Sequence, residues 1–166
     1  MRLVFKLKHH FFNAFREIFV HHHGSLEFRA KVFALVISAN DNAEDESYSI
    51  VKNTALDIYD NDDERANLLM MTTKELVKKV KDNNGLDLDT LISSIQKELK
   101  IVPRYAKKID IDSLQPIVAL SHDINTISYQ ENILEFLQNL KNETLSSKKS
   151  QIVEDEEKLL QESNTK

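Results

Sequence analysis

Glycine and proline are almost absent from this sequence: the 166 residues contain two of each. β-Barrels and β-sandwiches need turn residues in quantity, because their chain reverses direction after every short strand. Hydrophobic residues make up 41% of the chain and supply enough apolar side chains for a buried core. A chain of this length corresponds to one domain. The sequence therefore predicts an all-α fold, a single helical bundle domain of about seven helices.

The same composition excludes several classes of function. Two glycines cannot build a Gly-rich phosphate-binding loop, and the absence of cysteine excludes disulfides, thiolate zinc sites and thiol catalysis. No apolar run reaches the ~18 residues that a membrane span needs. His122 stands beside Asp123, but no nucleophile or oxyanion donor accompanies the pair. We therefore predict a cytoplasmic protein that is not an enzyme.

Charge is distributed unevenly along the chain. Residues 1–32 hold six Lys/Arg and two Glu, a local charge of +4, and residues 33–166 hold sixteen Lys/Arg and twenty-five Asp/Glu, or −9. Residues 41–64 contain nine carboxylates and a single cation, Lys52. Because phosphate contacts need clustered cations, we expect no nucleic-acid partner for the acidic part. The acidic segments 40–46 and 60–64 are the predicted recognition surface for a protein partner of unknown identity.

Residues 1–23 are predicted to form a basic and aromatic amphipathic helix. Its apolar side chains recur at helical spacing, with cations largely on the other side. Three interpretations stand side by side: the stripe packs on the domain's own core, it lies on an anionic membrane surface, or it packs on a second copy in a homodimer or in the groove of a partner. The apolar positions are Val4, Leu7, Phe11, Phe12, Phe15, Ile18 and Phe19.

Apolar residues at helical spacing predict a series of helices after this segment. The expected ranges are about 26–39, 45–60, 63–81 and 128–141. A further helix is expected to start at Asp87 or Asp89, and another to follow Asp110 and Asp112. Predicted N-terminal caps are Ser25, Asp41 paired with Glu44, and a Ser-x-x-Glu box formed by Ser128 and Glu131.

The two prolines and the composition of the tail set the expected domain limits. Pro103 marks a break between helices, and Pro116 is expected in a first helical turn, where its missing N–H costs nothing. The helical domain is predicted over residues 24–142. Residues 143–166 are predicted to form an acidic tail, either partly helical or disordered.

Two parts of the chain share one pattern, in which an apolar helix is followed by an acidic turn and a second amphipathic helix. The first is centred on Asp41 and the second on Asp123, and a further carboxylate follows each, Glu46 and Glu131. Over residues 26–141 this arrangement resembles the TerB-like family of tellurite-resistance domains, and most closely the version that precedes the J domain in DjlA-type DnaJ-like co-chaperones. The family's remaining features have counterparts in residues 69–80, in Asp87-Leu88-Asp89-Thr90-Leu91 and in Pro103.

The sequence also departs from the family pattern. Asn42 and Ile124 stand where the family's acidic turns carry glycine, and no His-Pro-Asp tripeptide of a J domain occurs. The resemblance implies a non-catalytic interaction or scaffold module, linked to stress response or chaperone recruitment at the membrane surface.

The resemblance also implies a weak divalent-metal site at Asp41, Glu46, Asp123 and Glu131. Hard cations such as Ca²⁺ and Mg²⁺ prefer several oxygen ligands, which paired acidic loops supply. The simpler interpretation is that these carboxylates cap helix N-termini, and it needs no cofactor at all. A small metal-binding protein is therefore the alternative to the interaction module.

Overall fold

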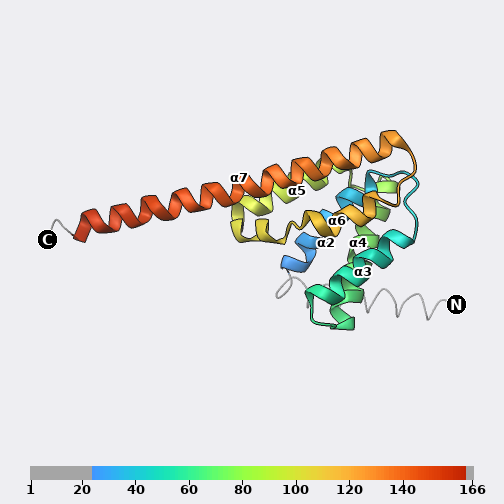
Figure 1. Cartoon of the computed structure of the whole chain (residues 1–166), viewed down its shortest axis with the longest axis horizontal. Coiled ribbons are helices and arrows are strands. Elements are labelled where there is room, and N and C mark those ends of the chain that lie inside the picture. Colours follow the sequence, from blue (N-terminus) through green and yellow to red (C-terminus); the bar gives the residue numbers. More distant parts are fainter. Residues whose placement is uncertain (1–23, 164–166) are drawn as a thin grey trace.

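The computed structural model describes residues 24–163, which form a helical bundle with one long projecting helix (Figure 1). Within that range the chain has seven helical elements and no strand, so the predicted all-α bundle is confirmed there. The predicted amphipathic helix over residues 1–23 lies outside the described residues. The elements are α2 (Gly24–Ser38), α3 (Glu46–Ile58), α4 (Asp63–Lys81), α5 (Leu88–Ile101), the 3-10 helix η1 (Pro103–Lys108), α6 (Ile111–Val118) and α7 (Ile124–Ser163).

Helix α2 is the centre of the bundle. It contacts α4, α5, η1, α6 and α7 (Figure 1). From Val32 to Ser38 every residue of α2 is buried, and a helical segment that is apolar on every side is stable only when other elements surround it. The charged residues of α2, Glu27, Arg29 and Lys31, all precede this segment, and Lys31 Nζ lies 2.7 Å from Glu98 Oε1 of α5. The buried residues of α2 are Leu26, Phe28, Ala30, Val32, Phe33, Ala34, Leu35, Val36, Ile37 and Ser38.

Helices α3 and α4 pack against each other, and α4 also packs against α2. The bounds of α4 agree with the predicted range 63–81. Its N-cap is Asp62, whose side chain accepts a hydrogen bond from the Arg65 amide at 3.1 Å. Asp87 caps α5 in the same way, accepting from the Thr90 amide at 2.7 Å. These two helices begin where the sequence places a carboxylate before an apolar-periodic run.

Other predicted caps are wrong. Ser25 is already inside helix α2 and is not its N-cap. Asp41 and Glu44 do not cap α3; Asp45 occupies the N-cap position and makes no side-chain cap hydrogen bond. Pro116 is the sixth residue of α6 rather than part of its first turn, because α6 begins directly after Asp110. The helix ends two residues later, at Val118.

Helix α7 begins four residues earlier than predicted, so the Ser128–Glu131 capping box does not form. Asp123 precedes the helix, and its carboxylate accepts hydrogen bonds from the backbone N and the hydroxyl of Thr126, at 2.8 and 3.0 Å. The Asp-x-x-Thr pattern at 123–126 therefore outcompetes the Ser-x-x-Glu pattern that follows it. A carboxylate at this position also meets the positive end of the helix dipole.

This cap makes the stability of the fold depend on pH. The backbone and side-chain hydrogen bonds from Thr126 hold the pKa of Asp123 below its ordinary value of 3.8. A carboxyl with a lower pKa when folded stabilises the fold above its unfolded pKa, and the contribution is lost as the pH falls through the folded value. We expect Asp123→Ala to lower the melting temperature at neutral pH, and the difference from the parent chain to shrink below pH 3.8.

Thermal unfolding followed by circular dichroism from neutral to strongly acidic pH measures this effect. Asp123→Asn is the control, because asparagine also caps helices but does not titrate. A difference between the parent chain and Asp123→Ala that stays constant over the whole range would show that this carboxylate does not stabilise α7 through its charge.

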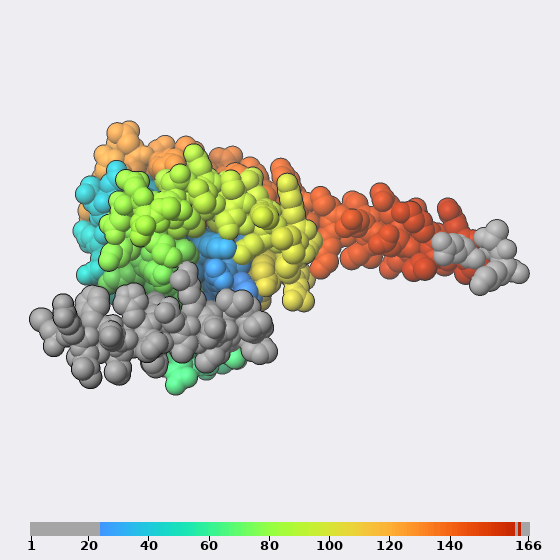
Figure 2. All heavy atoms as spheres, turned by 180° about the vertical axis from the view of Figure 1, so that it is seen from behind, coloured from blue at the N-terminus to red at the C-terminus, as the bar shows by residue number. Residues whose placement is uncertain are grey.

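Helix α7 is 40 residues long and projects beyond the body of the molecule. Its first half packs on the core through Ile133, Leu134 and Leu137. From Lys149 to Gln161 every side chain is exposed, and Figure 2 shows this part extending away from the remaining helices as a single arm. The part of the chain between 143 and 163, for which helix and disorder were both considered, is thus helical. No helix within residues 24–163 is both long enough and apolar enough to cross a membrane.

Candidate functional site

A chain of hydrogen bonds joins the turn after α2 to the turn before α7. Asn40 Nδ2 donates to Ser121 Oγ at 3.2 Å, and Ser121 Oγ donates to Gln130 Oε1 at 2.6 Å. Gln130 Nε2 then donates to the backbone carbonyl of Val36 at 3.0 Å. The two turns that share a sequence pattern therefore lie side by side in the fold.

Gln130 is the centre of this network and is almost completely buried, with 1% of its surface exposed. The last four carbonyls of a helix have no partner within the helix, and that of Val36 is one of them. Gln130 supplies the missing donor from α7, while Asn40 N caps the Ile37 carbonyl at 3.1 Å. A buried amide with both ends bonded fixes the relative position of α2 and α7.

The four predicted metal-site residues do not converge on one point. Asp41 is exposed in the turn after α2, Glu46 is the exposed first residue of α3, and Glu131 is exposed on α7. Asp123 is bonded to Thr126 as the cap of α7. Within residues 24–163, no group of three or more His, Asp or Glu side chains is close enough to hold a metal ion.

A different set of residues surrounds Asp41 and forms a hollow of about 660 Å³, which we call the acidic groove. Four elements contribute to it: the C-terminal end of α2 with its turn, the end of α4, the start of α5, and α7. Its charged residues are three carboxylates and one cation, a net charge of −2. The lining residues are Ser38, Asp41, Val80, Lys81, Asn83, Asp87, Leu88, Asp89 and Tyr129.

Three features of the acidic groove suit a cationic ligand. The hydrogen bonds from Thr90 hold the pKa of Asp87 below its ordinary value of 3.8, so this carboxylate keeps its charge into acidic solution. The ring of Tyr129 is 46% exposed and can accept a cation on its face. Ser38 is 7% exposed, and its buried hydroxyl oxygen has no hydrogen-bond partner among the described residues. Such a polar atom is costly unless a ligand or water satisfies it.

Sequence reasoning identified only one carboxylate of this groove as a site residue. Asp87 and Asp89 were recognised as starting a helix, and Tyr129 was not singled out. They are 46, 48 and 88 positions from Asp41 by subtraction of residue numbers, and no local pattern joins them. Only the packing of α5 and α7 against the end of α2 brings them together.

The predicted recognition surface is divided by the fold. Segments 40–46 and 60–64 stand at opposite ends of α3, which has 13 residues and is therefore about 20 Å long. Asp63 at the far end pairs with Lys52 at 3.2 Å, and Asp62 pairs with Arg65 at 3.4 Å. Asp62 and Asp63 are thus engaged in local ion pairs, and no residue of 60–64 lines the acidic groove.

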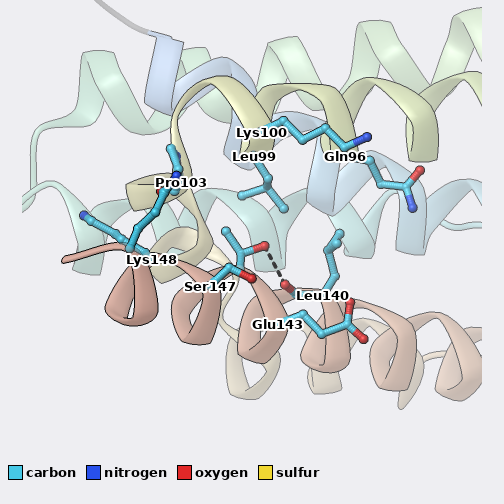
Figure 3. A pocket seen from close by; sticks show the side chains of 10 residues that line it. Gln96, Leu99, Lys100, Pro103, Leu140, Glu143, Ser147 and Lys148 are labelled. Atoms are coloured by element: carbon cyan, nitrogen blue, oxygen red, sulfur yellow. Dashed lines mark hydrogen bonds between the residues drawn. The ribbon is translucent and has the colours of Figure 1, made fainter. Parts of the chain in front are cut away.

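A second hollow, of about 470 Å³, lies between α5, η1 and α7 (Figure 3). Leu99 points from α5 toward α7, and Leu140 points back from α7. Its charged lining residues are Lys100 on α5 and the pair Glu143 and Lys148 on α7. The Thr144 hydroxyl is already bonded to the Leu140 carbonyl at 2.7 Å. Among the described residues, no buried polar atom without a partner lines this hollow, in contrast to the acidic groove.

Three comparisons with known proteins find no relative of this chain. A scan against models of protein families finds no match. Searches of curated proteins and of solved structures find no similar protein either.

Proposed function

We propose that this protein is a non-catalytic interaction module that binds a cationic segment of a partner protein in the acidic groove. The observation that carries the proposal is that Asp41, Asp87, Asp89 and the half-exposed Tyr129 line one hollow. Carboxylates bind arginine through paired charge-assisted hydrogen bonds, and aromatic faces attract the same guanidinium. Ser38 supplies a buried hydroxyl that a bound donor or acceptor can satisfy.

The resemblance to TerB-like domains belongs to this proposal. Its support is the hydrogen bond between Asn40 and Ser121, which places the two acidic turns beside each other as a paired repeat requires. A role in stress response or chaperone recruitment follows from that resemblance alone. The dispersed positions of Glu46, Asp123 and Glu131 favour an interaction module over a metal-binding protein.

Binding of a labelled cationic peptide tests the proposal. We expect the full chain to bind a fluorescein-labelled peptide of alternating arginine and leucine at low salt, as measured by fluorescence anisotropy. Asp41→Asn combined with Asp89→Asn is expected to raise the Kd by about a hundredfold, because each of the two lost charge-assisted contacts contributes about 1.5 kcal/mol or more. Asp87 is left unchanged in this variant because it caps α5.

The matched control is Asp57→Asn combined with Glu64→Gln. Both residues are exposed and outside the groove, and the double change alters the net charge equally. Equal weakening by the two double variants would show that the peptide responds only to net charge. Absence of binding at low salt, where attraction is strongest, would contradict the proposed function.

A further inference from the structure

The projecting part of α7, residues 145–163, is called the α7 arm here. It carries four large apolar side chains in contact with solvent: Ile152 is 48% exposed, Val153 53%, Leu159 65% and Leu160 63%. Figure 2 shows the arm standing clear of the body of the molecule. Exposed apolar side chains at helical spacing on an isolated helix indicate a surface that another helix covers.

The apolar residues of the arm lie on one side of the helix. At 3.6 residues per turn they fall within a sector of about 120° together with two charged residues, one basic and one acidic. We call this set the arm stripe. Its members are Leu145, Lys149, Ile152, Val153, Glu156, Leu159 and Leu160.

Six of the seven residues of the arm stripe are placed symmetrically about the midpoint between positions 152 and 153, and Leu159 is the exception, because its counterpart is Ser146. Lys149 and Glu156 each lie three and a half positions from that midpoint, as subtraction of the residue numbers shows. Leu145 and Leu160 likewise each lie seven and a half positions from it. An antiparallel two-fold axis exchanges residues at equal distances on its two sides, so a surface with this order is complementary to itself.

We propose that two copies of this chain associate through the arm stripe as an antiparallel pair of helices. Lys149 of each copy then faces Glu156 of the other, and Leu145 faces Leu160. In a parallel pair in register, Glu156 would face Glu156 and Lys149 would face Lys149, which is repulsive. Lys149 and Glu156 lie near the middle of the arm stripe, and polar residues within an apolar seam select the orientation in which they find a partner.

Leu145 is half-buried against the core of its own body, so the seam begins where the arm leaves the body. No residue of the acidic groove takes part.

The mass of the full chain in solution tests this inference. Sedimentation equilibrium from about 1 µM to about 500 µM covers the range in which a short two-helix contact is expected to associate. We expect a reversible monomer–dimer equilibrium. Lys149→Glu alone and Glu156→Lys alone each replace two attractive pairs per dimer by repulsive ones, and each is expected to raise the dimer Kd by at least about tenfold. The double variant Lys149→Glu/Glu156→Lys exchanges the charges and is expected to restore the dimer.

Matched controls stand on the other side of the same helix. Glu154→Lys and Lys158→Glu make the same charge changes roughly opposite the arm stripe, and we expect the dimer Kd to stay within about twofold of the parent value. All four positions are exposed in the described structure, so none of these changes disturbs the folded body.

Three results would overturn the inference. A full chain that stays monomeric over the whole concentration range would assign the arm stripe to another occupant, either another protein or residues 1–23. A dimer unaffected by either single reversal would place the contact elsewhere. A dimer weakened by both single reversals but not restored by the charge exchange would exclude the antiparallel arrangement.

Discussion

Phe28→Ala is expected to lower the free energy of unfolding by about 4 kcal/mol, which corresponds to a fall of about 10 °C or more in melting temperature. Phe28 lies in the central helix and is 0% exposed. Its ring contacts that of Tyr105 in η1, with 5.3 Å between the ring centroids and a tilt of 39°. Truncation removes the buried ring and leaves a cavity that the surrounding helices fill only in part. Urea unfolding followed by circular dichroism measures the change.

Tyr129→Ala is the control for this truncation. It also removes an aromatic ring from a helix, but that ring is 46% exposed, and we expect a loss of less than about 1 kcal/mol. Equal losses in the two variants would show that α2 is not the buried centre of the bundle.

Gln130→Leu is expected to destabilise the fold by about 2–3 kcal/mol, although leucine is close to glutamine in size and more hydrophobic. The change leaves the Val36 carbonyl without its donor and the Ser121 hydroxyl without its acceptor. A buried polar atom that loses its partner costs about 1–3 kcal/mol, which exceeds the gain from the apolar side chain. The same unfolding measurement applies.

Gln138→Leu, on the same helix, separates this effect from helix propensity. Its amide bonds to Asn142 at 2.9 Å on the exposed side of α7, where water replaces a lost partner. We expect a change within about 0.5 kcal/mol. If Gln130→Leu proved as mild as this control, the buried network would not hold the two turns together.

Helix type and several helix starts were predictable because they depend on neighbours in the sequence. The limits of α4 and the start of α5 at Asp87 follow from a carboxylate before an apolar-periodic run. The start of α7 was wrong because two capping patterns follow each other, and only the bonds of Asp123 to Thr126 decide between them. Local patterns of similar strength cannot be ranked without the tertiary structure.

The buried surroundings of α2 were predictable only in part. The spacing of apolar residues predicted a helix at about 26–39, but it did not predict that this helix is buried on nearly every side. A helix without a polar face gives no direction to its packing, and the number of covering helices depends on the rest of the chain.

The acidic groove depends entirely on tertiary packing. Asp41 was identified as a candidate, but its neighbours Asp89 and Tyr129 come from α5 and α7. The burial of Gln130 has no signal in the sequence, because a buried glutamine and an exposed glutamine look the same within a polar helical segment. The sequence does contain the repeated pattern around Asp41 and Asp123. In the fold, the hydrogen bond between Asn40 and Ser121 joins the two turns of that pattern.

Cationic binding at the acidic groove is the central claim, and a residue-resolved NMR titration tests it most directly. Adding the unlabelled arginine–leucine peptide to the ¹⁵N-labelled full chain at low salt is predicted to shift the amides of Asp41, Asp89 and Tyr129 together, with a common Kd. These residues come from three separate elements, so a joint response requires a ligand in the groove. Shifts confined to residues 60–64 or to the α7 arm, or no shifts at all, would contradict the claim.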